Sequence, residues 1–193
     1  MLTVGDTLPM FNLKALVSLE AGKEFRDISS SMYEGRWLVL FYWPLSFSKT
    51  FPPELFDFGR RYGELLERGC DVLAASTDAP YIHLAWRKEH PALVGLPFPT
   101  LADFKRELAR RLGVVSKHDG APLRATFLID PDRTIRWACA YDQGIERSAT
   151  DVIRVLDGIA PASRVRYSTL DTARFPSSRP PPAMPSVQLE AAG

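Results

Sequence analysis

Apolar residues are concentrated in short runs that predict the strands of a mostly buried sheet. The longest run extends from Arg36 to Trp43 and is continuously aliphatic or aromatic after its first residue, as in a strand covered on both faces. Val72–Ser76 predicts a second strand. Ala125–Ile129 and Thr134–Ala140 predict two more, and the Pro and Asp residues between them, at 130–133, are typical of a turn. We therefore expect these last two strands to form a hairpin.

Helices are predicted where apolar residues recur at three- and four-residue spacing. The segment after Pro52 has such a face, and Gly69 is expected to end its helix. The face is formed by Leu55, Phe58, Tyr62 and Leu65. Further helices are expected over Tyr81–Glu89, over Leu101–Leu112 and from near Ser148. Strands and helices that alternate, followed by a hairpin and a closing helix, predict an α/β fold of the thioredoxin-like type.

The composition of the chain changes near residue 160. From about Pro161 onward the sequence is rich in Pro, Ser, Arg and Ala, with Arg179-Pro180-Pro181-Pro182 near its centre. A segment of this composition cannot bury a core of its own. We expect one α/β domain, a central sheet flanked by helices, over residues 1–160, and a Pro-rich extended or disordered tail over residues 161–193.

Charge and targeting signals narrow the possible partners. The 24 Lys and Arg residues nearly balance the 23 Asp and Glu residues, which leaves a formal net charge of +1 without a basic run. This balance argues against nucleic acid and membrane surfaces as partners. Residues 1–6 lack a positive segment followed by an apolar one, and the run that ends at Trp43 is too short to cross a bilayer. A cytoplasmic location is therefore expected.

The cysteines and histidines show no metal-site or disulfide pattern. Cys70 and Cys139 fall in apparent strands, where a cysteine usually serves as a small buried apolar residue. Neither starts a helix or adjoins a basic cluster, the settings that lower the pKa of a thiol. His83, His90 and His118 do not have the spacing of metal ligands. We expect neither a metal nor another cofactor.

The loop after the first predicted strand carries the most informative motif. Residues 41–54 read Phe-Tyr-Trp-Pro-Leu-Ser-Phe-Ser-Lys-Thr-Phe-Pro-Pro-Glu. This segment resembles the active-site loop of peroxiredoxins of the alkyl hydroperoxide reductase C / thiol-specific antioxidant family, which reads F-Y-P-L-D-F-T-F-V-C-P-T-E. The resemblance places Phe51 where the family has the cysteine whose thiolate attacks peroxide. A phenyl ring neither ionises nor cycles between oxidation states, so we expect no thiol peroxidase chemistry at this position.

The resemblance extends from Val4 to about Ile159. Four further segments match family motifs in the same order: Ser76–Trp86, Leu96–Asp103, Leu123–Pro131 and Ile145–Leu156. Because alkyl hydroperoxide reductase C proteins form dimers and rings, the resemblance implies a homodimer or a higher ring.

Several positions depart from the family pattern. Ser46 stands where the family has an acidic residue. Lys49 and Thr50 replace an aromatic residue and a valine, and residues 160–182 contain no resolving cysteine. The chain therefore lacks both thiols that the resemblance would assign to a catalytic cycle.

The residues that the motif retains suggest a different use of the same pocket. The resemblance implies that Pro44 shields the site, that Ser48 binds through its hydroxyl and that Arg124 stabilises negative charge. A hydroxyl and a guanidinium beside an aromatic wall can hold a carboxylate, a phenolate or an enolate. The candidate substrate contacts are Pro44, Phe51, Trp43, Tyr42, Glu54 and Arg147. In the alternative interpretation Arg124 only pairs with Glu54 and the neighbours of Arg147 in a structural network, and Tyr42 is a core residue of its strand.

Lys49 and His83 are further candidate catalytic residues, for proton transfer. A desolvated lysine on the site loop can act as a base or form a Schiff base, whereas a solvent-facing loop lysine has no such role. A histidine at position 83 can act as a general acid or base. The family carries a histidine at that position too, which favours a structural or interface role.

Three functions are consistent with the sequence. The first is a peroxiredoxin-like protein that binds or transforms a small organic molecule with an anionic or enolisable group, without thiol or metal chemistry. The second is a non-catalytic scaffold or a subunit partner of an active peroxiredoxin. The third is a residual peroxidase that uses Cys70 or Cys139.

Overall fold

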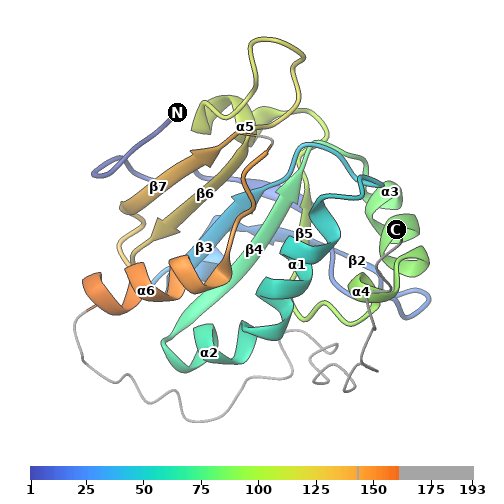
Figure 1. The fold of residues 1–193 in the computed structure, drawn as a ribbon, viewed down its shortest axis with the longest axis horizontal. Coiled ribbons are helices and arrows are strands. Elements are labelled where there is room, and N and C mark those ends of the chain that lie inside the picture. Colours follow the sequence, from blue (N-terminus) through green and yellow to red (C-terminus); the bar gives the residue numbers. More distant parts are fainter. Residues whose placement is uncertain (143, 161–193) are drawn as a thin grey trace, which may run out of the picture.

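In the part of the chain that the structure describes, seven strands form one mixed sheet at the centre of the fold (Figure 1). Its order is β2-β1-β5-β4-β3-β6-β7, with β3 parallel to β4, β4 parallel to β5 and the other neighbours antiparallel. The strands are β1 (Asn12–Leu16), β2 (Phe25–Ser29), β3 (Trp37–Tyr42), β4 (Cys70–Ser76), β5 (Thr100–Ala102), β6 (Arg124–Ile129) and β7 (Ile135–Tyr141). The computed structural model describes residues 1–142 and 144–160, so the tail predicted over residues 161–193 lies outside the described residues.

Strand β3 supplies side chains to both faces of the sheet. Because successive side chains of a strand point to opposite faces, Leu38, Leu40 and Tyr42 enter one core cluster. Val39 and Phe41, with Trp43 just past the end of the strand, enter the other. All six expose 1% of their surface or less. The prediction of a strand buried on both faces is confirmed.

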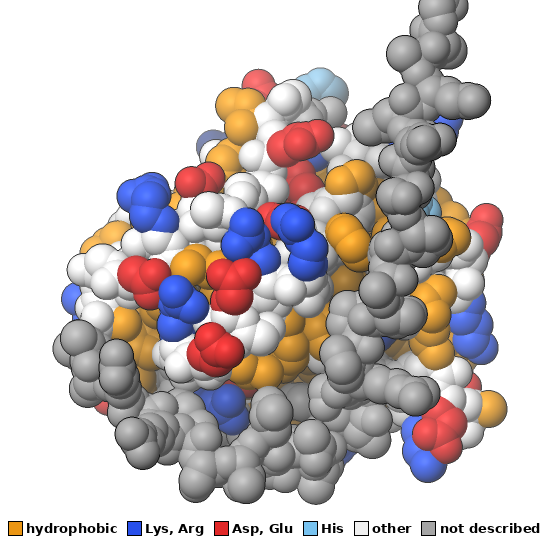
Figure 2. Space-filling view, turned by 60° about the horizontal axis from the view of Figure 1, so that its bottom comes forward, with side chains coloured by type: hydrophobic (Ala, Val, Ile, Leu, Met, Phe, Trp, Pro, Cys, Tyr) orange, Lys and Arg blue, Asp and Glu red, His pale blue; other side chains and the backbone are white. Residues whose placement is uncertain are grey.

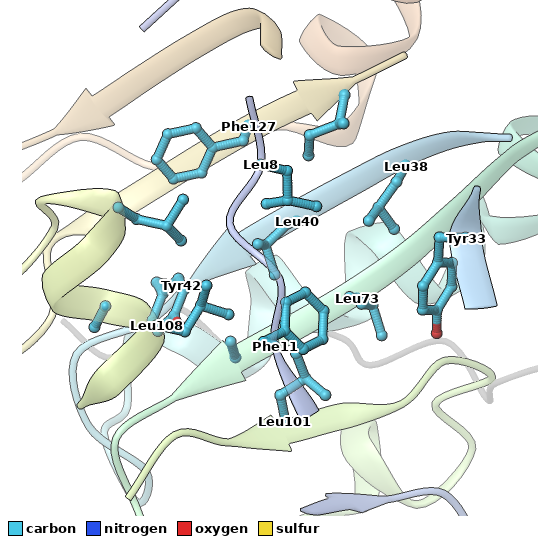
Figure 3. Close-up of a cluster of buried hydrophobic side chains, with 14 of the residues drawn as sticks. Leu8, Phe11, Tyr33, Leu38, Leu40, Tyr42, Leu73, Leu101, Leu108 and Phe127 are labelled. Carbon is cyan, nitrogen blue, oxygen red and sulfur yellow. The ribbon is translucent and has the colours of Figure 1, made fainter. Parts of the chain in front are cut away.

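The helices cover the two faces unequally. The first cluster, shown in Figure 3, packs the N-terminal segment and α5 (Glu107–Leu112) against one face of the sheet. Five helices pack on the second cluster. They are α1 (Phe51–Arg60), α2 (Tyr62–Glu67), α3 (Pro80–Glu89), α4 (Pro91–Val94) and α6 (Ala149–Ile159).

The helix predicted after Pro52 is two helices. Helix α1 ends at Arg60 and α2 begins at Tyr62, and Arg61 between them has the non-helical backbone angles φ −95° and ψ 7°. The Arg61 side chain forms ion pairs with Asp57 on one helix and Glu64 on the other. The apolar spacing continues across the break, which is why the sequence does not reveal it.

The helix predicted over Leu101–Leu112 is wrong in its first half. Leu101 belongs to β5, and α5 begins only at Glu107, after Arg106 in the left-handed region at φ 59°. The buried Asp103 carboxylate accepts the amides of Leu108 and Ala109 at 3.2 and 2.7 Å. Satisfying these first-turn donors fixes where the helix starts.

The N-terminal part of the sheet was not predicted. Strands β1 and β2 pair over five residues each, and the 3₁₀ turn η1 (Ser30–Tyr33) leads from them towards β3. Short helix α4 also has no clear sequence signal. No helix in the described part of the chain has the length and apolar character needed to cross a membrane. On the face shown in Figure 2, acidic and basic side chains are interspersed rather than gathered by sign.

Candidate functional site

The site lies where β3 ends and α1 begins. After Tyr42 the chain leaves the sheet through the loop of residues 43–50 and enters α1 at Phe51. The side chain of Thr50, at the N-cap position of α1, makes no capping hydrogen bond, and Pro52 and Pro53 have no amide hydrogen to donate. The first turn of α1 is therefore anchored mainly by the packing of its side chains.

Glu54, on that first turn, forms ion pairs with two arginines of other elements. Its Oε1 lies 3.3 Å from Nε of Arg124 on β6, and its Oε2 lies 3.8 Å from Nε of Arg147 before α6. The backbone amide of Arg147 also donates to Oε1 at 3.2 Å. Each of the three residues exposes 3% of its surface. The structure thus brings together three residues predicted from separate motifs.

The guanidinium groups hold more donors than this carboxylate can accept. Arg124 Nη1 donates to the carbonyl of Ile145, and Arg147 Nη2 donates to the carbonyl of Tyr42 at 2.7 Å. Among the described residues, Arg124 Nη2 and Arg147 Nη1 are buried and have no hydrogen-bond partner. A buried donor without a partner is unfavourable, so a ligand that supplied acceptors here would gain binding energy.

Two phenyl rings lie against the guanidinium groups. The Phe51 ring centre is 4.7 Å from Cζ of Arg124, and the Phe41 ring centre is 4.8 Å from Cζ of Arg147. Distances of this size allow cation–π attraction. Phe51 exposes 7% of its surface and covers Arg124.

Burial controls the electrostatics of the cluster. It raises the pKa of Glu54, while the charges of Arg147 and Arg124 act to lower it. Burial also lowers the pKa of Arg147 to about 10, which leaves the guanidinium charged at neutral pH. With Glu54 as a carboxylate, the three side chains carry one net positive charge.

The predicted residues of the loop lie at the edge of this cluster. Pro44 and Ser48 are half-buried and Lys49 is exposed. The Ser48 hydroxyl oxygen accepts the Thr50 amide at 3.2 Å, a local turn contact. Within residues 1–142 and 144–160, neither Ser48 nor Lys49 forms a hydrogen bond or ion pair with the two arginines. Their predicted contact with a ligand stays a prediction.

His83 belongs to a hydrogen-bond chain that sequence reasoning did not assemble. Its Nε2 lies 2.7 Å from Oγ of Ser76, and that hydroxyl donates to Asp78 Oδ2 at 3.0 Å. The same Asp78 oxygen accepts the amide of Ser46 in the site loop at 2.9 Å. The Ser-x-Asp…His spacing pointed to Ser76, Asp78 and His83, but it did not predict their hydrogen-bond link to the site loop. The His83 and Trp43 ring centres are 5.2 Å apart.

The Tyr42 side chain points away from the site. Its hydroxyl donates to Asp103 Oδ2 at 3.1 Å, in the core cluster on the opposite face of the sheet from Phe51. Only the Tyr42 carbonyl, which accepts from Arg147, takes part in the site. The structure therefore supports a core role for the Tyr42 side chain.

Both cysteines lie in strands, as predicted. Cys70 is fully buried in β4, and burial raises the pKa of its thiol well above the usual range. Cys139 is half-buried in β7, and burial raises its pKa too. Neither environment favours a thiolate.

Comparison with known proteins gives a consistent result. The family model described as the AhpC/TSA family matches residues 4–138. Alkyl hydroperoxide reductase C of Mycolicibacterium smegmatis is 35% identical over 167 residues, which cover 82% of this chain and 85% of that protein. A thioredoxin peroxidase of Echinococcus granulosus is 36% identical over 157 residues, which cover 80% of this chain and 79% of that protein.

Solved structures agree with these sequence matches. Mycobacterium bovis AhpC superposes with a TM-score of 0.78 at 36% identity, covering 83% of this chain and 99% of that one. Enterococcus faecalis AhpC superposes with a TM-score of 0.77 at 32% identity, covering 82% of this chain and 92% of that one.

Proposed function

The chain belongs to the AhpC/TSA family of peroxiredoxins, and on that premise we propose that it uses the family's site without thiol peroxidase chemistry, to bind or transform a small organic molecule with an anionic or enolisable group. Phe51 stands in the family's motif where the attacking cysteine is expected. Neither Cys70 nor Cys139 is in an environment that replaces it.

The observation that carries this proposal is the surplus of buried positive charge and donors beside Phe51. Arg124 and Arg147 share one carboxylate, and within residues 1–142 and 144–160 each keeps a buried N–H group without a hydrogen-bond partner. A purely structural network of this kind would be expected to satisfy its donors. A carboxylate, phenolate or enolate would supply both the acceptor and the negative charge.

Roles for the remaining residues follow from their positions. The Phe51 and Trp43 side chains, both in the second core cluster, would provide apolar contacts for the organic part of the ligand. Ser48 and exposed Lys49 on the loop are the candidates for polar contact and proton transfer when a ligand is present. Buried His83 would instead hold the loop in place through Ser76 and Asp78.

The test is thermal stabilisation by fractions of a host metabolite extract. Wild type, Arg124→Ala and the control Arg154→Ala, an exposed arginine of α6, are compared in each fraction. We expect at least one fraction to raise the melting temperature of wild type and of the control but not of Arg124→Ala. If every stabilising fraction acts equally on all three proteins, the proposal is wrong.

A second candidate function is that of an assembly subunit, either as a homo-oligomer or beside an active peroxiredoxin. It is favoured by large apolar side chains exposed on the site loop and on the first turn of α3. Leu45, Phe47, Tyr81 and Ile82 expose 60, 50, 71 and 42% of their surface. The Phe47 ring centre lies 6.3 Å from that of buried Trp86, so the site loop packs against α3, the helix that carries the other two exposed side chains.

We propose that a second copy of the chain binds this surface, because the family resemblance implies dimers and rings. Native mass spectrometry of wild type and Phe47→Arg tests this. We expect the variant to shift the population towards monomer. An unchanged oligomer distribution would count against self-association through this surface.

A further inference from the structure

We infer that the site accepts a single monoanion, an organic monocarboxylate, whose two oxygens bridge Arg124 and Arg147, and that the Phe51 ring must turn away to admit it. This inference rests on the proposed function and specifies its ligand and its route of entry. It follows from three features of the cluster: its net charge, its N–H groups without a partner, and the Phe51 ring that lies against Arg124.

The charge of the cluster selects a monoanion. Two guanidinium groups and the Glu54 carboxylate leave one buried positive charge. Burial of an uncompensated charge is unfavourable, and one negative charge removes the imbalance, whereas a dianion would leave a negative excess. Glu146 is exposed, and it acts on Glu54 only through its charge. Cys139 and Tyr141, which lie near Arg147, are neutral at physiological pH because burial raises the pKa of each.

The free donors favour a carboxylate. Glu54 forms ion pairs with the Nε atoms of both arginines, at 3.3 and 3.8 Å but without a hydrogen bond, and backbone carbonyls accept from Arg124 Nη1 and Arg147 Nη2. Among the described residues, Arg124 Nη2 and Arg147 Nη1 are buried with neither a hydrogen bond nor an ion pair. A carboxylate has two acceptor oxygens, one for each of these groups, and its plane suits guanidinium geometry.

Phe51 controls access to the arginines. Arg124 and Arg147 expose 3% of their surface each, and the Phe51 ring lies directly against the Arg124 guanidinium. Phe51 is the first residue of α1, where no side-chain cap and no proline amide holds the helix start. Its movement breaks no capping hydrogen bond, at the expense of its contact with Arg124 and of its packing in the second core cluster.

Three probes with the same ring separate charge from shape: benzoate as the monoanion, benzamide as its neutral analogue and terephthalate as the dianion. Their dissociation constants are measured by calorimetry on wild type. We expect benzoate to bind at least about tenfold more tightly than either of the others. Equal binding of benzamide or terephthalate, or no binding of benzoate, overturns the inference of a monoanion site.

The rate at which benzoate associates tests whether the Phe51 ring limits access to the arginines. We expect Phe51→Ala to bind benzoate at least about tenfold faster than wild type in stopped-flow fluorescence. Phe104→Ala, which removes an exposed phenylalanine before α5, is the matched control and should keep the wild-type rate. If Phe51→Ala does not fold by circular dichroism, Phe51→Leu replaces it. An unchanged rate in the folded variant overturns the role of Phe51.

The outcomes separate this inference from the proposed function. An Arg124-dependent metabolite that is neutral or doubly charged would refute the monoanion site and leave the proposed function standing. Equal benzoate binding by wild type and Arg124→Ala, together with no Arg124-dependent metabolite, would refute both.

Discussion

The Arg124 guanidinium carbon lies 4.7 Å from the centre of the Phe51 ring. This contact joins β6 to the first residue of α1, and it fills with a phenyl group the position that the family resemblance assigns to a reactive thiol. The cationic surroundings remain in place: Arg124 and Arg147 both contact Glu54 three residues further along the helix.

Phe51→Cys should gain reactivity towards peroxide. The new thiol would stand at the start of a helix beside a guanidinium, two features that lower a thiol pKa. We expect wild type to show no sulfenic acid by mass spectrometry after peroxide treatment and Phe51→Cys to show it readily. Phe47→Cys, an exposed thiol in the same loop, is the control. Equal oxidation of the two variants would mean that the surroundings of position 51 do not activate a thiol.

Glu54→Gln should destabilise the fold strongly. It leaves two buried guanidinium groups without a counter-charge, and breaking a buried ion pair from one side costs about 3–5 kcal/mol. Urea unfolding of Glu54→Gln, Arg124→Met and the double variant measures the coupling between the two residues. We expect the double variant to lose less unfolding free energy than the two single variants lose in total. Additive losses would show that the Glu54–Arg124 pair contributes nothing of its own.

His83 should make stability fall in mild acid. Burial lowers its pKa from 6.5 to about 4, so the unfolded chain takes up a proton more readily than the folded one. The stabilising contribution is complete above pH 6.5 and is lost as the pH falls from 6.5 to 4. It amounts to about 3 kcal/mol.

The pH dependence of His83→Gln tests this assignment. We expect the unfolding free energy of wild type to decline more steeply between pH 6.5 and pH 4 than that of His83→Gln. His118→Gln, which changes an exposed histidine, should follow wild type. Parallel curves for wild type and His83→Gln would show that another group causes the acid sensitivity.

Asp103→Ala should shorten or loosen α5. The carboxylate accepts from the amides of Leu108 and Ala109 and from the Tyr42 hydroxyl, and all of these donors would lose their partner. We expect a loss of at least about 1–3 kcal/mol in urea unfolding, because one buried donor without a partner costs that much and three donors are affected. Tyr42→Phe removes only one of the bonds and should cost less. A larger loss in Tyr42→Phe would contradict this account of Asp103.

The sequence revealed the fold class because strong signals coincide along the chain. The uninterrupted apolar run of β3, the hairpin of β6 and β7 and the ordered family motifs all point to the thioredoxin-like fold that the similar structures confirm. The start of α5 could not be predicted because it depends on the Asp103 carboxylate. That carboxylate can accept the first-turn amides of α5 only when the pairing of β5 with β4 holds it in place.

The sequence named three residues that the structure brings together, but it did not predict their geometry. Motif matching found Glu54, Arg124 and Arg147, which three distant segments supply. It could not show that both arginines share one carboxylate, or that each keeps a donor without a partner. Because side chains alternate along β3, the Tyr42 ring points to the face of the sheet away from the site. Its carbonyl points in a different direction and accepts from Arg147 in the site.

The position of β3 between two buried clusters has a consequence for how the protein opens. Its amides pair with β4 on one side and β6 on the other, so their exchange with solvent deuterium requires global unfolding. The loop of residues 43–50 and the first turn of α1 have no such partners on both sides, so their amides should exchange through local opening. Movement of Phe51 would then leave the centre of the sheet fixed, and Arg124, on β6, would keep its position while the phenyl ring against it moves.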